Sequence, residues 1–440
     1  MKTSKISGII LFLIIFIIAC SPLAAAQSPA SSRPVEVIPL PFAGPGENSS
    51  YALHVADNGQ LVTLNSRYGP DLFAYNGNGS LIWSKTLSAE QSPWISSVSI
   101  SPGAQDLILT QMVPACCHGS VTNTSSNKVI FLDKNGTKMG EYPTMNPPLA
   151  SAISSSGQDF FIGTEDGRIL CLNPGGTLRW TIWIEAPVTS FAVSRDGNTL
   201  VATGESNYNF HDLYNEPLNP VDLIVLDQNG TVLWDYQTGG LNTATVSDDG
   251  SVIAVLEKRS GNLLVFNRSG SRIAKKMLGG AASALSMTGD GNLIVTETTA
   301  GTVYGLNRTG ATLWTIPVDP GSSGLGFIDK ENSLVLGDGQ SVALYDLQGI
   351  LIEKYTAGGQ IQVIAPAGYA LPVVSGTDHS LVFFSARQLK KETGISAGAP
   401  SMTTPTSAAS SQVPTKASVS LCIPVFALAC YVFGMTALGK

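Results

Sequence analysis

The chain of 440 residues contains few charged residues, few cysteines and none of the short motifs that mark common catalytic sites. Asp, Glu, Lys and Arg make up 13% of it, about half the share found in ordinary soluble domains. No HExxH pair, phosphate-binding loop or nucleophile motif occurs. Only three of the six cysteines, Cys116, Cys117 and Cys171, lie outside the hydrophobic terminal segments. A fold held together by several disulfides is therefore excluded.

Positive charge is also scarce. The formal net charge is −7, and Lys2, Lys5 and Lys440 are the only charged residues of the two terminal segments. Residues 27–418 therefore carry a net charge of −10. An acidic body of this kind repels the phosphates of nucleic acids, so we expect no nucleic-acid partner.

Residues 1–26 resemble a secretory signal peptide. Two lysines precede an apolar run from Ile9 to Ala19, and three alanines, Ala24–Ala26, stand before Gln27 as a cleavage site. The alternative is a lipoprotein signal, because Ile17–Cys20 loosely fits the sequence that precedes a lipidated cysteine. Both alternatives predict an exported protein.

The C-terminal tail, residues 419–438, is predicted to be a transmembrane anchor. It is 20 residues long and uncharged, which as a helix spans about 30 Å, the thickness of a bilayer core. Residues 388–418, rich in Ser, Thr, Pro and Ala, are predicted to be a linker. Two alternatives are a buried helix and a tail that is exchanged for a lipid anchor near Ser407 and Ala408. We expect a cell-surface protein whose folded part is anchored in the plasma membrane.

A repeated turn decides the fold class. In seven segments Asn or Asp stands three residues before Gly, and the turn glycines are 57, 40, 54, 40, 40 and 39 residues apart. The Asn or Asp side chain caps such a turn, and the glycine takes a positive φ. The seven turns are Asn76–Gly79, Asp133–Gly136, Asn173–Gly176, Asp227–Gly230, Asn267–Gly270, Asn307–Gly310 and Asp346–Gly349. The period is thus about 40 residues, with two insertions.

A second turn lies upstream in several repeats, as in Ser194–Gly197, and strands of alternating polarity flank both turns. Four antiparallel strands, A to D, per repeat of this length are typical of a β-propeller blade. Residues 35–387 are therefore predicted to form an all-β, eight-bladed propeller. Seven blades are complete, and Val35–Leu40 is expected to supply the missing strand of the eighth. Seven blades with a capping sheet are the alternative.

The segment Asp166–Trp180 resembles the quinoprotein-type (PQQ-like, WD40-like) repeat. Trp83, Trp234 and Trp314 occupy the same place as Trp180, four residues after the turn glycine, whereas blades 2, 5 and 7 depart from the pattern. The resemblance implies a ring in which each Trp packs between blades. It extends to binding-only members of the family, including outer-membrane assembly propellers and archaeal surface proteins, so it indicates fold more than function.

Two further patterns were considered. Seven N-x-[ST] sequons are candidate glycosylation sites, and they are Asn48, Asn78, Asn123, Asn135, Asn229, Asn267 and Asn307. The adjacent Cys116 and Cys117 form a candidate vicinal disulfide. Some quinoprotein dehydrogenases carry such a ring beside their cofactor, which makes a quinone-dependent oxidoreductase, or a propeller-type lyase, the alternative function.

The candidate binding face is the one that bears the loops between strands B and C. Both insertions, Met112–Asn127 and Glu205–Pro220, fall there, and loops carry function more often than framework does. Histidines and acids recur in the same loops, namely His118, Glu165, Asp166, Glu205, His211, Asp212, Glu257, Glu297, Asp338, Asp378 and His379. We predict no catalytic residue. A divalent cation is the one candidate cofactor. The hypothesis is a surface scaffold that binds a protein, glycan or cation.

Overall fold

The computed structural model describes fourteen stretches of the chain, and they form an all-β fold. These are residues 36–41, 51–66, 69–87, 93–112, 127–184, 186–205, 222–238, 240, 242–320, 324–328, 332–357, 359–366, 370–375 and 380–385. All regular structure within them is strand, and the strands make eight antiparallel sheets of four. The predicted all-β class with four strands per blade is confirmed.

Seven of the sheets are blades, each made of four consecutive strands, A to D. Blade 1 has β2 (Tyr51–Val55), β3 (Leu61–Ser66), β4 (Asp71–Asn76) and β5 (Leu81–Thr86); blade 2 has β6 (Trp94–Ile100), β7 (Asp106–Met112), β8 (Lys128–Asp133) and β9 (Lys138–Pro143). Blade 3 has β10 (Pro148–Ile153), β11 (Phe160–Thr164), β12 (Arg168–Leu172) and β13 (Leu178–Trp183); blade 4 has β14 (Val188–Val193), β15 (Leu200–Gly204), β16 (Leu223–Leu226) and β17 (Val232–Tyr236).

The remaining three blades repeat this order. Blade 5 has β18 (Asn242–Val246), β19 (Val252–Glu257), β20 (Asn262–Asn267) and β21 (Arg272–Met277); blade 6 has β22 (Ala282–Met287), β23 (Ile294–Thr298), β24 (Thr302–Leu306) and β25 (Thr312–Pro317). Blade 7 has β26 (Leu325–Ile328), β27 (Ser333–Asp338), β28 (Ser341–Tyr345) and β29 (Leu351–Thr356).

The eighth sheet differs in construction, and we call it the closing sheet. It joins β30 (Ile361–Ile364), β31 (Ala370–Ser375) and β32 (Ser380–Ser385) to β1 (Glu36–Pro39), which comes from the other end of the described chain. The register runs from Glu36 opposite Phe383 to Pro39 opposite Ser380. Pairing with β1 covers an edge of β32 that would otherwise be open.

The predicted count of eight blades is therefore corrected to seven. The repeat stops after its third strand at Ser385, and the closing sheet lacks the turn between strands C and D that defines each blade. Its fourth strand, β1, belongs to no repeat. The expected pairing of the segment near Val35–Leu40 with β32 is nevertheless observed.

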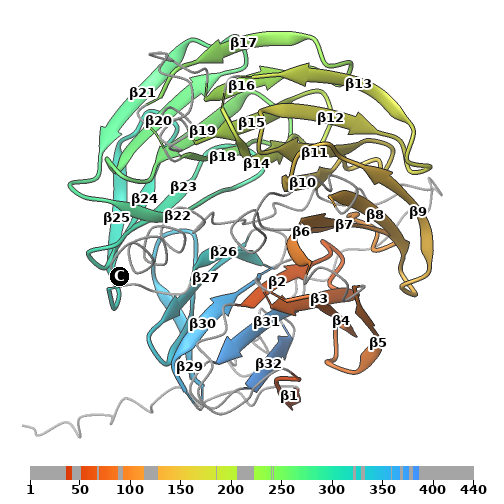
Figure 1. Ribbon diagram of the computed structural model, residues 1–440. Helices are drawn as coiled ribbons and strands as arrows, with labels where there is room; N and C mark the ends of the chain where they lie inside the picture. Colours follow the sequence, from red (N-terminus) through yellow and green to blue (C-terminus); the bar gives the residue numbers. More distant parts are fainter. Residues whose placement is uncertain are drawn as a thin grey trace, which may run out of the picture. The chain divides into compact units, whose positions relative to one another are not determined.

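Neighbouring sheets contact one another in an unbroken cycle. The A strands β2, β6, β10, β14, β18, β22 and β26 meet in succession, and β30 of the closing sheet contacts both β27 and β2. Figure 1 shows the same order, with the colours passing from blade to blade around the centre. Hydrophobic clusters fill the spaces between sheets; between blades 3 and 4, Phe161 packs against Phe191. Each fully buried side chain of this size contributes about 1.5–3 kcal/mol.

The turn between strands C and D is built as the sequence predicts. The Asp227 carboxylate accepts hydrogen bonds from the backbone N–H groups of Asn229 and Thr231, both at 2.8 Å. Gly230 follows at a φ of 81°, a left-handed conformation that side-chain-bearing residues rarely adopt. The same cap and glycine end strand C in all seven blades.

Three predicted segments lie outside the described residues: the signal peptide 1–26, the linker 388–418 and the anchor 419–438. Within the described stretches, no helix is long and apolar enough to cross a membrane.

Candidate binding face

The strands of each blade run between two opposite faces. The turns between A and B and between C and D lie on one, which we call the turn face. The loops between B and C, and the connections from one blade to the next, lie on the other, which we call the loop face. Since antiparallel strands alternate in direction, β7 and β15, the strands that precede the two insertions in the sequence, both end at the loop face. The insertions themselves, residues 113–126 and 206–221, lie outside the described residues.

Several predicted site residues lie outside the described residues. They are His118, His211, Asp212, Asp378 and His379, together with Cys116, Cys117, Asn48 and Asn123. Their roles remain predictions. The six other predicted loop-face residues can be placed.

Glu205 connects two blades. Its side chain is buried at the end of strand B of blade 4, and its Oε1 lies 3.3 Å from Nη2 of Arg259, in the turn between β19 and β20 of blade 5. Burial raises the pKa of Glu205, and the positive charges of Arg259 and Lys258 oppose that rise. The pair therefore ties neighbouring blades at the root of the second insertion.

Two other acids support the local framework. Glu257 is buried and accepts hydrogen bonds from the Ser260 hydroxyl and the Asn262 amide, each at 2.7 Å, which shapes the turn into strand C. Asp338 accepts the backbone N–H of Asp319 at 2.7 Å and pairs with Lys354 at 3.1 Å. These contacts join a blade to its incoming connection and to its own outer strand.

Glu297 is fully buried on β23, opposite Ala284 and Val303 of the flanking strands. The predicted acids are thus spread over blades 3 to 7 and not gathered. Among the described residues, no group of three or more His, Cys, Asp and Glu side chains has the geometry to hold a metal ion.

On the loop face of blade 3, the turn between β11 and β12 is held by several side-chain contacts. The Asp166 carboxylate accepts the Thr164 hydroxyl at 2.6 Å and pairs with Nε of Arg168 at 2.8 Å. Its backbone carbonyl accepts the indole N–H of Trp183 at 2.7 Å. Trp183 is nevertheless 61% exposed. Sequence reasoning missed this residue, because it stands three positions after Trp180 and outside the repeat pattern.

The repeat tryptophans have a different place, at the turn face. The indole N–H of Trp83, Trp180, Trp234 and Trp314 donates to a backbone carbonyl in the next blade, on Lys134, Gln228, Arg268 and Leu347 respectively, at 2.9–3.2 Å. Each ring lies against the turn glycine of that blade, so closely that a Cβ on Gly230 would come within 2.7 Å of Trp180. Each indole therefore docks one blade onto the turn of the next.

The junctions without tryptophan close in another way. A Cβ on Gly176 would meet Phe131 of blade 2, and one on Gly310 would meet Ala274 of blade 5. Two glutamates take the tryptophan position beside the closing sheet: Glu353 on blade 7, opposite Leu344, and Glu36 on β1, opposite Phe383.

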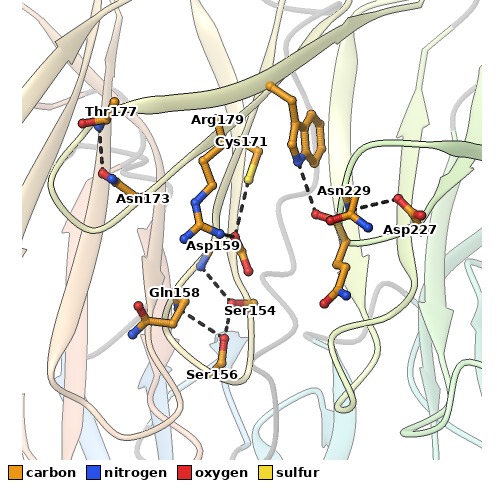
Figure 2. A network of polar contacts seen from close by, with 12 residues as sticks. Ser154, Ser156, Gln158, Asp159, Cys171, Asn173, Thr177, Arg179, Asp227 and Asn229 are labelled. Atoms are coloured by element: carbon orange, nitrogen blue, oxygen red, sulfur yellow. Dashed lines mark hydrogen bonds and ion pairs between the residues drawn. The ribbon is translucent and has the colours of Figure 1, made fainter.

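Figure 2 shows polar contacts at the turn face of blade 3, around the turn between strands A and B. Asp159 accepts the thiol of Cys171 at 3.7 Å and the guanidinium of Arg179. Burial, and then the charge of Asp159, raise the pKa of the Cys171 thiol to about 12. Because the thiolate is the reactive form, this buried thiol is chemically inert at neutral pH.

Five of the candidate glycosylation sites lie in described turns between strands C and D. Asn78, Asn135 and Asn229 are exposed at the third position of the turn, whereas Asn267 and Asn307 are the capping residues. All five therefore lie on the turn face.

Comparison with known proteins agrees with this architecture. The family model described as outer membrane protein assembly factor BamB matches residues 125–286 and, in an overlapping match, 220–362, which together exceed half of the chain. No curated protein sequence matches.

Solved structures resemble the chain over most of its length. BamB from Moraxella catarrhalis is 21% identical, with a TM-score of 0.56 and coverage of 80% of this chain and 99% of that one. Sqt1 from Chaetomium thermophilum, bound to the N-terminus of the ribosomal protein L10, is 15% identical, with a TM-score of 0.57 and coverage of 78% and 98%. The designed protein Ika8 is 14% identical, with the same TM-score and coverage. At these identities the likeness shows the fold alone.

Proposed function

Since the chain belongs to the family of the outer membrane protein assembly factor BamB, we propose that its propeller is a cell-surface scaffold that binds a protein partner through the loop face. The family match carries this proposal. It covers blades 3 to 7 completely, and its description is that of an assembly factor for outer membrane protein.

The division of contacts between the two faces supports the choice of the loop face. Docked tryptophans and capped turns occupy the turn face, where a change of sequence disturbs the packing between blades. The insertions open on the other side. Because a doubled loop length costs only about 0.6 kcal/mol, long insertions are retained where they are used and not where stability requires them.

A second candidate comes from the neighbour Sqt1, whose structure holds the N-terminus of another protein. It favours an extended segment of a partner, in preference to a folded domain, as the bound element. Glycan and cation partners are less favoured, because the described acids of the loop face are used in framework contacts.

Anchoring at the surface is part of the same proposal. The signal peptide 1–26 directs export, and residues 419–438 hold the propeller at the membrane through the linker 388–418. Lipidation at Cys20 is the alternative anchor. The two differ in a measurable way, because lipidation leaves a mature chain that begins at Cys20 with an added acyl mass, and signal cleavage leaves one that begins at Gln27.

Two experiments test the proposal on the full chain in its native cells. Labelling of intact cells with a membrane-impermeant biotin reagent should modify the propeller, and the mass of the intact mature protein should identify the anchor. Isolation of the tagged chain in mild detergent should then retain one cell-surface protein. A propeller that is not labelled from outside, or that retains no protein at low salt, would contradict the proposal.

A further inference from the structure

One aspartate holds an exposed tryptophan and an exposed arginine on the loop face of blade 3. The carbonyl of Asp166 fixes the indole of Trp183, and its carboxylate fixes Nε of Arg168. Arg168 and Trp183 are also direct partners across β12 and β13. Because both side chains are held before a ligand arrives, little of their rotamer entropy is lost on binding.

The connection from blade 2 meets the same turn. The backbone N–H of Glu165 donates to the carbonyl of Pro147 at 2.9 Å, which brings this connection against the turn that contains Asp166. Met145, two residues before Pro147, is 71% exposed. We call Trp183 and Arg168, together with Met145 of this connection, the Trp183 patch. Trp and Arg dominate the binding energy of protein interfaces, and exposed Met adapts to varied partners.

The hydrogen bonds of the turn decide which ligand chemistry fits. Both carboxylate oxygens and the carbonyl of Asp166 each accept a hydrogen bond from within the turn, so this residue has less acceptor capacity left for the hydroxyls of a sugar. Among the described residues, the side chain of Arg168 bonds only through Nε, and it is 49% exposed. The rest of its planar fork remains suited to a carboxylate. The turn therefore offers a ligand the apolar ring of Trp183 beside one cation, Arg168.

We propose that the Trp183 patch is where the loop face binds an extended, acidic segment of the partner protein, with apolar side chains on the Trp183 ring and one carboxylate on Arg168. This inference rests on the proposed function and specifies its partner. Strand β13 supports it, since it is the outermost strand of its sheet and its free edge runs beside the patch, where an extended chain can lie.

Blade 5 supplies a matched control position. Met277 ends strand D there as Trp183 does in blade 3, and it is 74% exposed. Its cross-strand partner is Asn262, whose amide is bonded to Glu257. The control position is therefore equally accessible and apolar but carries no arginine.

The test begins with a photo-crosslinker, p-benzoylphenylalanine, placed in the full chain in intact cells. It replaces Trp183, Met277, or one of two other exposed loop-face residues, Ala300 and Gln340. We expect a protein adduct at position 183 and none at 277, with an Asp or Glu flanked by apolar residues in the crosslinked segment. Adducts at 300 or 340 without one at 183 would overturn the patch but leave the proposed function standing. No adduct at any position would contradict both, and a glycan adduct at 183 would overturn the inference.

A synthetic peptide of the crosslinked segment then tests the two contacts in solution. We expect Trp183→Ala to weaken its binding to the full chain about 30-fold and Arg168→Glu about as much, with Met277→Ala unchanged. A peptide in which Lys replaces the acid should recover affinity for Arg168→Glu. Unchanged affinity in either the Trp183 or the Arg168 variant would overturn the inference. The melting temperature separates loss of contact from loss of fold, since both side chains are exposed.

Discussion

The turn face and the loop face of the ring are held by different kinds of contact. On the turn face the same contacts recur from blade to blade: a capped turn, a glycine of positive φ and, at four junctions, a docked indole. On the loop face backbone contacts also recur, as from Ile184 to Gly167 and from Leu278 to Gly261. The Glu205–Arg259 pair and the bond from Trp183 to Asp166, by contrast, each occur at one place among the described residues. Repeated contacts therefore build the framework, and single side-chain contacts distinguish one blade from another.

The inner turns of the turn face add a second line of connections. The N–H of Asp196 donates to the carbonyl of Asp248 at 3.0 Å, and the N–H of Asp248 donates to that of Gly289 at 2.7 Å. Blades 4, 5 and 6 are thus linked through their turns between A and B, and blades 4 and 5 are also linked through Trp234. A face occupied by contacts of this kind has few groups left for a ligand.

The largest effect on stability is expected at a docked indole. Trp180→Ala removes the ring that packs against Gly230 and the bond to the carbonyl of Gln228, and should lower the free energy of unfolding by roughly 3–5 kcal/mol. Trp94 starts strand A of blade 2, outside the repeat position of the docked indoles, so Trp94→Ala should cost less. Denaturant unfolding measures both; equal losses would mean that docking adds nothing.

Loss of the closing strand should rank next. Deletion of residues 27–45 removes β1, whose four residue pairs with β32 cover the sheet edge, but most β1 side chains are exposed. We expect a loss of about 2–3 kcal/mol and greater self-association through the open edge. The melting temperature and the sedimentation coefficient check this. A deleted chain that melts like the intact one would show that β1 does not close the ring.

Substitution of turn glycines separates two contributions to the stability of a docked turn: the left-handed backbone conformation of the glycine and its contact with the indole. Gly197 has a φ of 73° and open space around it, so Gly197→Ala should cost only the backbone term, about 1 kcal/mol. Gly230→Ala should cost about 2–3 kcal/mol, because the new Cβ also meets the indole of Trp180. In a Trp180→Ala background this excess should disappear. An excess that persists would place its cause elsewhere than the indole.

Smaller effects should differ in sign with pH between the faces. On the turn face, the backbone N–H of Ser251 and the hydroxyl of Ser247 lower the pKa of Asp249. Its stabilising effect is present above the ordinary Asp value of 3.8 and is lost as the pH falls through the lowered pKa. On the loop face, burial raises the pKa of Glu205. Its contribution is present below the ordinary Glu value of 4.5 and is lost as the pH rises through the raised pKa.

Two substitutions test these opposite pH dependences of stability. Asp249→Ala should be most destabilising at neutral pH, and its cost should shrink as the pH falls below 3.8, the ordinary Asp pKa. Glu205→Gln should gain stability relative to the wild-type chain as the pH rises toward 7. Thermal unfolding across this range measures both, and parallel curves for the two variants would refute the assigned signs.

The sequence predicts the framework well because the framework is repetitive. Seven copies of one turn identify the blades, and the incomplete last repeat points to the partner strand near Val35–Leu40. The predicted number of eight blades was wrong. The last three strands and β1, from the other end of the described chain, form a sheet but not a complete repeat. The loop face was predicted only in outline. Whether Glu257 faces a ligand or caps its own turn depends on contacts with Ser260 and Asn262 that alternation of polarity does not encode.

Trp183 was missed for a related reason. A tryptophan at the end of a strand has the same sequence pattern whether its ring is buried or exposed, and only the bond to the Asp166 carbonyl shows that it is held on the surface. Unique contacts therefore require the structure, whereas repeated contacts can be recognised from their spacing.

The most direct test of the account changes charge on one face at a time and measures partner affinity and melting temperature together. Arg168→Glu with Trp183→Glu alters exposed residues of the loop face, and Asn135→Glu with Asn229→Glu alters exposed turn positions. The account predicts that the loop-face pair weakens binding of the isolated partner at least about tenfold with an unchanged melting temperature, and that the turn-face pair leaves affinity intact. Loss of binding in the turn-face pair, with the loop-face pair unaffected, would contradict it.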